Sequence, residues 1–160
     1  MLHLTALHLE QLHQHALKCY PEECCGLLLG KSLGDSAQVT EIWLTPNSWT
    51  PDFLASPPIE NNPDPENVVS EASRLNHFAI APIELLRAQK YARSKASDIV
   101  GIYHSHPNHP AVPSEYDRRI AWSQYSYLIM AVVGDQITKT RSWKLSGDRQ
   151  FLEELVTITH

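Results

Sequence analysis

Two histidines and an aspartate occur at a spacing that suits a metal ion. Residues 104–107 read His-Ser-His-Pro, and six residues later Ser114 begins the segment Ser-Glu-Tyr-Asp that ends at Asp117. Residues two apart on a strand point to the same face, so His104 and His106 can converge on one point. Two imidazoles and one carboxylate leave the fourth position of a tetrahedral zinc ion to water, as in catalytic zinc sites. The sequence therefore predicts a Zn²⁺ site formed by His104, His106 and Asp117.

Each of these residues also has an ordinary structural explanation. His104 and His106 would be a pair of histidines at the edge of the core. Asp117 would complete a capping box that Ser114 begins, in the pattern Ser-x-x-Asp. Neither explanation requires the residues to occur together at this spacing, and their joint occurrence in one short segment favours the metal site.

A hydrolytic zinc site needs further groups beside its ligands. Zinc lowers the pKa of bound water from 15.7 to about 7, but a base must still take the proton and pass it to the leaving amine. Glu23, in the segment Pro-Glu-Glu-Cys-Cys-Gly at 21–26, is the candidate for this role, and Glu22 is its rival. An oxyanion donor is also required. The hydroxyl of Ser114 is the nearest candidate, although we expect that it cannot also cap a helix in the same rotamer.

The elements that must position these groups are strands and helices in mixed order. A strand is predicted over Ile99–His106, and Ser114 is a natural N-cap that places Asp117 in the first turn of a helix. A short buried strand is expected over Cys25–Leu29, directly after Glu23. We expect further strands at 38–45, 77–81, 127–133, 137–145 and 151–158, and helices at 10–19, 64–75 and 83–96. This order predicts an α/β layered domain.

Length and composition narrow the class of protein. A chain of 160 residues fits a single domain over 1–160, and 42% apolar and 19% charged residues are ordinary for a soluble globular protein. A net charge of −5 argues against a nucleic-acid binder, and no apolar segment is long enough to span a membrane. No signal peptide is evident. The three cysteines, Cys19, Cys24 and Cys25, are too few and too crowded for a disulfide framework, so we expect a cytoplasmic protein.

The segment from 46 to 76 differs in composition from the rest of the chain. It holds six of the 11 prolines, and five acidic residues against one arginine. A loop of this length is usually functional or mobile. We interpret it as a solvated loop in preference to a lid over the site.

The motif at 104–117 resembles the JAMM signature of the MPN+ metallopeptidases. Residues 21–28 (Pro-Glu-Glu-Cys-Cys-Gly-Leu-Leu) are similar to the segment that carries the family's catalytic glutamate, with Glu23 at the glutamate position. The likeness continues through 100–103 and 125–129, so it covers most of the chain. Within the six-residue gap, His-Pro-Ala at 109–111 is typical of short bacterial members that act on a sulfur-carrier protein.

The resemblance implies a fold, an activity and a substrate. The fold would be a cytidine-deaminase-like mixed β-sheet flanked by helices. The activity would be zinc-dependent hydrolysis of an amide or isopeptide bond after the C-terminal tail of a ubiquitin-like or sulfur-carrier protein. The loop at 46–76 is longer than the family pattern leads us to expect, which affects substrate preference and not the metal.

Two other functions remain open at this point. The domain could be a non-catalytic MPN scaffold, although such domains typically lack the ligands that this chain keeps. It could also be a metallohydrolase of small amide substrates. Other reactive side chains are expected to have structural roles: Cys24 and Cys25 as packing residues, and His3, His8, His13 and His15 as solvated surface residues. His109 is expected to line the site without binding the metal.

Overall fold

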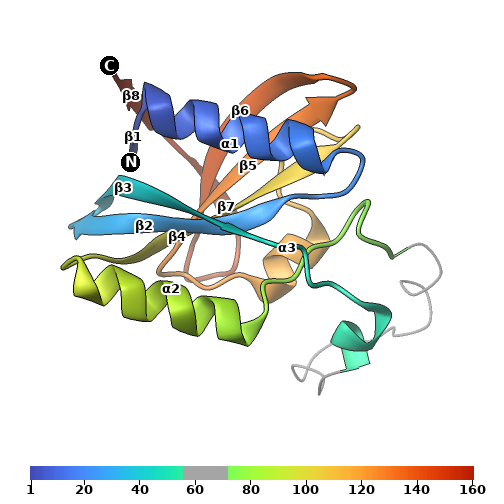
Figure 1. The fold of residues 1–160 in the computed structure, drawn as a ribbon, viewed down its shortest axis with the longest axis horizontal. Coiled ribbons are helices and arrows are strands. Elements are labelled where there is room, and N and C mark those ends of the chain that lie inside the picture. Colours follow the sequence, from blue (N-terminus) through green and yellow to red (C-terminus); the bar gives the residue numbers. More distant parts are fainter. Residues whose placement is uncertain (56–71) are drawn as a thin grey trace.

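In the part of the chain that the computed structural model describes, residues 1–55 and 72–160, eight strands form one mixed sheet (Figure 1). Their order across the sheet is β7-β6-β5-β4-β2-β3-β1-β8. β4 and β5 are parallel, as are β1 and both of its neighbours, and the other pairs are antiparallel. The strands are β1 (Leu2–Thr5), β2 (Cys25–Leu33), β3 (Ser36–Thr45), β4 (Asp98–Pro107), β5 (Ser126–Val133), β6 (Gln136–Leu145), β7 (Phe151–Glu154) and β8 (Val156–Thr159). The predicted α/β fold class is confirmed.

The two edge strands of the sheet are consecutive in the sequence. β7 and β8 lie at opposite ends of the strand order, yet only Leu155 separates them in sequence. The amide of Leu2 donates to the carbonyl of Leu155 at 2.9 Å, which holds β1 against this junction. The prediction of one continuous strand over 151–158 was therefore wrong, because the chain bends at Leu155 to pair with β6 before the bend and β1 after it. β1 itself was not predicted.

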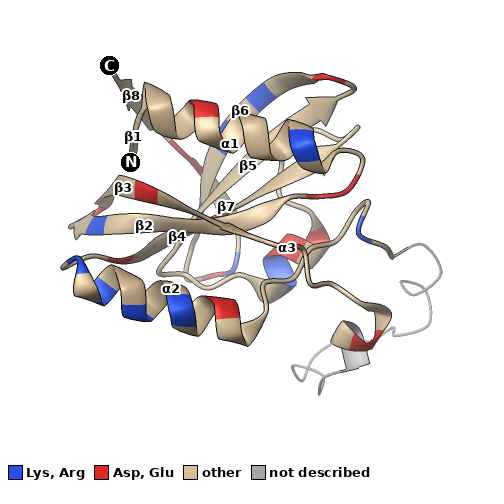
Figure 2. Ribbon diagram, viewed as in Figure 1, with Lys and Arg blue, Asp and Glu red and all other residues tan. Residues whose placement is uncertain are grey.

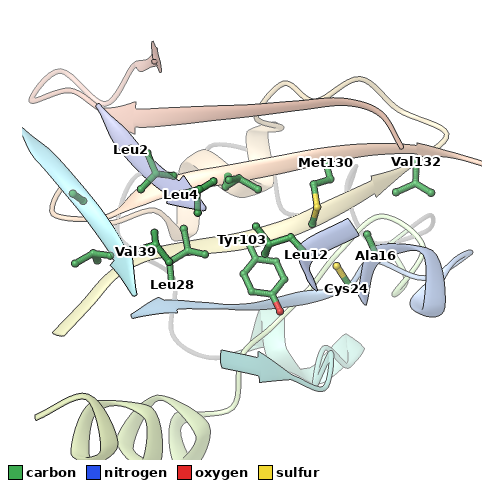
Figure 3. Close-up of a cluster of buried hydrophobic side chains, with 13 residues drawn as sticks. Leu2, Leu4, Leu12, Ala16, Cys24, Leu28, Val39, Tyr103, Met130 and Val132 are labelled. Atoms are coloured by element: carbon green, nitrogen blue, oxygen red, sulfur yellow. The ribbon is translucent and has the colours of Figure 1, made fainter. Parts of the chain in front are cut away.

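Helices cover both faces of the sheet. α1 (Ala6–Cys19) lies on one face and α2 (Pro82–Ser94) on the other, while η1 (Pro51–Ala55) and α3 (Glu115–Ile120) are short (Figure 1). The alternation of side chains along β2 explains this arrangement, because Leu28 packs on the α1 side and its neighbours Leu27 and Leu29 pack against α2. Figure 3 shows the α1 side, where Leu12, Leu28 and Tyr103 belong to one cluster of buried side chains.

The charged residues of α2 point away from the sheet. Ala88 and Ala92 form the buried face of this helix, whereas Arg87, Lys90 and Arg93 are exposed. Figure 2 shows the blue bands of Lys and Arg along α2. Such a helix is amphipathic, as expected of one that covers a sheet. Within 1–55 and 72–160, no helix combines the length and the apolar character that crossing a bilayer would require.

The segment at 77–81 differs from its prediction. We expected a strand, but these residues belong to no strand. One backbone hydrogen bond, from the Ser48 amide to the Ala79 carbonyl at 2.9 Å, links the segment to the chain beyond β3. The amide of Ala79 instead donates to the side chain of Asn47, so no ladder forms. The expected helix at 64–75 lies largely outside the described residues, and its last residues, 73–75, form a bend and turn.

Candidate metal centre

His104 and His106 lie where the central strand β4 leaves the sheet. In β4, His104 is paired with Cys25 of β2 on one side and Ile129 of β5 on the other. The β2 ladder ends at this pair, whereas pairing with β5 continues past His106. The two imidazoles point to the same side, and their Nε2 atoms are 3.0 Å apart. The period-two prediction of convergence is confirmed.

α3 brings the third group to this point. Ser114 is the N-cap, and its Oγ accepts a hydrogen bond from the Asp117 amide at 3.1 Å. The Asp117 carboxylate turns back, so that Oδ2 accepts from the Ser114 amide at 2.6 Å. Oδ1 lies 3.1 Å from Nε2 of His104, and Oδ2 lies 3.3 Å from Nε2 of His106. Asp117 thus completes a capping box and reaches the two histidines.

The donor set fits a tetrahedral zinc ion. Ligand atoms about 2.0–2.2 Å from zinc at tetrahedral angles are separated by about 3.3–3.6 Å. Nε2 of His104 lies 3.0 Å from Nε2 of His106 and 3.1 Å from Oδ1 of Asp117, and Nε2 of His106 lies 3.3 Å from Oδ2, so the distances lie at or slightly below these separations. Nδ1 of His106 lies 2.8 Å from the Pro110 carbonyl, which assigns the proton to Nδ1 and leaves a lone pair on Nε2. All three side chains are buried. Nδ1 of His104 is buried with no hydrogen-bond partner among the described residues.

Burial and nearby charged groups determine the protonation states of His104 and Asp117. Burial lowers the pKa of His104, and the charge of Asp117 opposes this shift only in part, so the imidazole is neutral and able to bind a metal. Burial alone would raise the pKa of Asp117, but the neighbouring His104 and His106 outweigh it and hold that pKa well below its ordinary value. The site therefore offers a carboxylate and neutral imidazole nitrogen, which are the forms that bind a divalent cation.

Glu23 lies beside this cluster. Glu23 precedes β2 by two residues, and extending the Cys25–His104 register by the same number brings it opposite His106, with its Oε1 4.0 Å from Nε2 of that residue. Its side chain is buried, and burial, followed by the charge of Asp117, raises its pKa well above the ordinary value. Glu22, the rival candidate, is exposed in the preceding turn.

Ser114 is exposed at the start of α3. The cap uses a lone pair of Oγ to accept from the Asp117 amide, so the hydroxyl proton remains free for another acceptor. The cap therefore does not use the hydroxyl proton, and the role of Ser114 as an oxyanion donor stays a prediction.

An aromatic wall, formed by Phe78, Tyr116 and His77, lies beside His104 and was not predicted from the sequence. The ring of Phe78 stacks on His104 with centroids 4.4 Å apart. Tyr116 donates its hydroxyl to the Phe78 carbonyl at 2.7 Å, and His77 packs on Tyr116 with centroids 4.3 Å apart. The apolar run at 77–81 was the only signal, and it was interpreted as a strand.

The remaining reactive residues lie outside the metal cluster. Cys24 and Cys25 are buried, and burial raises the pKa of Cys25 to about 12, so it is a thiol that packs and not a nucleophile. All three cysteines are free. His109 is exposed and lines a shallow depression formed with Ala131 and Lys139, a group that does not include the metal ligands.

The histidines near the N-terminus are only partly solvated. Each of the four is half-buried. Nδ1 of His15 lies 2.9 Å from the hydroxyl of Tyr103, Nε2 of His13 lies 2.9 Å from Oγ1 of Thr140, and His8 completes the capping box of α1. The prediction of solvated surface residues was wrong in this respect, because the rings of His13 and His15 tie α1 to the sheet and that of His3 contacts Thr157 of β8.

The fold and this cluster of side chains agree with a comparison against known families. Residues 5–146 match the family described as prokaryotic homologs of the JAB domain. The chain therefore belongs to this family, and the resemblance to the JAMM proteins is confirmed.

Two curated proteins are similar to this chain over most of its length. The chain is 36% identical over 115 residues to desampylase of Haloferax volcanii, an alignment that covers 71% of this chain and 66% of that protein. It is 28% identical over 126 residues to a probable TtuB-protein conjugate cleaving protease of Thermus thermophilus, covering 79% and 67%. The chain thus spans about two thirds of the length of these relatives.

Solved structures support the fold. A protein of Desulfitobacterium hafniense, determined in solution, aligns with a TM-score of 0.76 at 28% identity, covering 99% of this chain and 93% of that one. A protein of Salinibacter ruber aligns with a TM-score of 0.67 at 28% identity, covering 99% and 92%. A JAB1/MPN domain protein from Archaeoglobus fulgidus has a TM-score of 0.53 at 14% identity, with 100% and 97% covered. The last likeness concerns the fold alone.

Proposed function

We propose that this chain is a zinc-dependent peptidase or isopeptidase that hydrolyses the amide bond after the C-terminal tail of a ubiquitin-like or sulfur-carrier protein. The observation that carries the proposal is the buried carboxylate of Glu23, 4.0 Å from His106 in a cluster with three convergent ligand atoms. A carboxylate next to an open metal position is what proton transfer during hydrolysis requires. The two relatives named for desampylation and for conjugate cleavage support this substrate class.

His104, His106 and Asp117 would hold the zinc ion, and the rest of the chain would guide the reaction. When bound, zinc would lower the pKa of a water molecule and polarise the scissile carbonyl. The positive charge would also favour the ionised form of Glu23, opposing the effect of burial. Glu23 would accept a proton at its carboxylate and donate it to the leaving amine. The Ser114 hydroxyl would donate to the developing oxyanion.

The proposal includes the setting in which the chemistry occurs. We infer one catalytic domain over 1–160 that acts in the cytoplasm, since all three cysteines are free and two of them are buried. The segment at 46–76 would be a solvated loop. The start of this segment lies next to the site, since Asn47 donates to the carbonyls of Glu23 and His77.

The test uses defined conjugates. The zinc-loaded protein is incubated with ubiquitin-like and sulfur-carrier proteins that carry C-terminal cysteine or lysine adducts, and the products are identified by mass spectrometry. We expect cleavage directly after the tail, and loss of cleavage on chelation and in Glu23→Gln. Zinc binding with no cleavage of any conjugate would favour the scaffold function. Cleavage of a tripeptide but of no tailed protein would indicate a hydrolase of small amides.

A further inference from the structure

We propose that Asn47 is a positioning residue that holds Glu23 at the metal centre, an inference that rests on the proposed function of Glu23. Asn47 follows β3, and its side-chain amide lies between three stretches of chain. Nδ2 donates to the carbonyl of Glu23 at 3.1 Å and to that of His77 at 2.9 Å. Oδ1 accepts from the amides of Trp49 at 3.1 Å and Ala79 at 3.2 Å.

These four bonds use the full capacity of an asparagine side chain. The amide group offers two N–H donors and an oxygen with two lone pairs, and each has a backbone partner. No other amino acid of this length presents two donors and two acceptors, and aspartate, its isostere, has no donor when ionised. The chemistry of this position therefore calls for asparagine itself.

Glu23 depends on this contact because β2 does not hold it. The ladder of β2 begins at Cys25, so the backbone of Glu23 has no strand partner. Its amide donates to the Arg74 carbonyl at 2.8 Å, and its own carbonyl accepts from Asn47. The carboxylate lies 4.0 Å from His106, beyond hydrogen-bonding distance, so no hydrogen bond to that residue fixes it and the backbone contacts of Glu23 help to set its position.

The Asn47 side chain also fixes the part of the aromatic wall that lies against His104. Its bonds to the His77 carbonyl and the Ala79 amide flank Phe78, the ring that stacks on His104. Asn47 thus fixes the segment that carries Phe78 relative to the backbone of Glu23. A proton carrier must remain within about 0.5 Å of its productive place to be effective, and the Asn47 side chain is the contact that links the backbone of Glu23 to the segment over His104.

The test is Asn47→Asp, which keeps the shape and both acceptor contacts but removes both donations. We expect kcat on the tailed conjugate to fall roughly 10- to 100-fold, as expected of a displaced catalytic group, with unchanged KM and full zinc occupancy. Gln89→Glu is the matched control, since it makes the same amide-to-acid change on the exposed side of α2 and should leave kcat unchanged.

A double-mutant cycle separates positioning of Glu23 from a general structural effect. Under single-turnover conditions with excess enzyme, Asn47→Asp should cost little in a Glu23→Gln background, because the group that it positions is already absent. Equal losses in both backgrounds would overturn the inference. So would wild-type kcat in Asn47→Asp when Glu23→Gln is inactive, and that result leaves the proposed function intact.

Two further outcomes are informative. Full turnover in Glu23→Gln would overturn the proposed role of Glu23, and with it the role given to Asn47. If both Asn47→Asp and the milder Asn47→Ser fail to fold or to bind zinc, Asn47 stabilises the fold and the positioning inference is overturned.

Discussion

The ring of Phe78 lies flat against the imidazole of His104, with centroids 4.4 Å apart and an angle of 24° between the planes. Phe78 is 3% exposed and His104 is fully buried, so the contact excludes water from one face of an imidazole that we propose binds the metal. Residues that hold a metal-binding side chain in its orientation are expected to influence the metal affinity strongly.

Phe78→Ala should therefore weaken zinc binding by roughly 10- to 100-fold, the range expected for loss of a supporting contact. Competition with a chromogenic chelator measures the affinity. Phe78→Leu, which retains apolar cover, should lose less. Equal affinities for the wild type and Phe78→Ala would show that the stacked ring has no influence on the metal.

Asp117→Asn separates the two functions of that side chain. The amide oxygen can still accept from the Ser114 backbone and preserve the cap, but the anionic ligand is lost. We expect zinc content after dialysis to fall below stoichiometry while the circular dichroism spectrum remains that of the wild type. Stoichiometric zinc in Asp117→Asn would remove this carboxylate from the ligand set.

Much of the site could be predicted from sequence because its geometry is local. The convergence of His104 and His106 follows from the two-residue period of a strand, and the return of Asp117 follows from a capping box that Ser114 begins. Glu23 was assigned through family resemblance, since its proximity to His106 depends on the register between β2 and β4.

The features that were missed are non-local. β1 has only four residues, and its pairing with β3 and β8 joins both ends of the chain. The path of the segment around Phe78 depends on an amide side chain, that of Asn47, about thirty residues earlier in the sequence. Periodicity within one segment contains no information about either relationship.

Gly26 is required by close packing in the sheet. A Cβ at this position would lie 2.4 Å from the carbonyl oxygen of Trp43 and 2.4 Å from the hydroxyl of Tyr103. The first of these contacts is with backbone, so it cannot be relieved by a side-chain rotation. Gly26→Ala should lower the free energy of unfolding by about 3 kcal/mol, measured by urea denaturation. Gly147→Ala, where nothing lies within 4 Å, is the control.

His15 should make stability depend on pH. Burial, and next the charge of Lys18, lowers its pKa in the folded state. The unfolded chain therefore binds the proton first, so the stabilisation is present above the unfolded pKa of about 6.5 and is lost as the pH falls below it. The cost arises because protonation places a charge on a half-buried ring close to Lys18.

Urea unfolding of the metal-free protein between pH 5 and 8 measures this dependence. Other buried groups also titrate, and Glu23, with its raised pKa, acts in the opposite sense, so the comparison is between the wild type and His15→Gln. In His15→Gln, the slope of the free energy of unfolding against pH on the acid side should be smaller by up to about 1.4 kcal/mol per pH unit. Parallel curves for the two proteins would show that His15 does not contribute.

The two roles of Ser114 can be separated with alanine and glycine. As an N-cap, glycine costs only a few tenths of a kcal/mol relative to serine, whereas alanine costs about 1 kcal/mol. Both substitutions remove the hydroxyl.

If that hydroxyl donates to the oxyanion, Ser114→Gly and Ser114→Ala should both lower kcat by about 10²- to 10³-fold, although only the alanine variant is clearly less stable. If the serine acts through the cap alone, Ser114→Gly should retain near wild-type kcat and Ser114→Ala should lose activity in proportion to the fraction of unfolded protein. Steady-state kinetics and thermal unfolding of the two zinc-loaded variants distinguish these outcomes. In an oxyanion role the hydroxyl is needed whatever the stability, so kcat falls in both variants, whereas in a cap role activity falls only where stability falls.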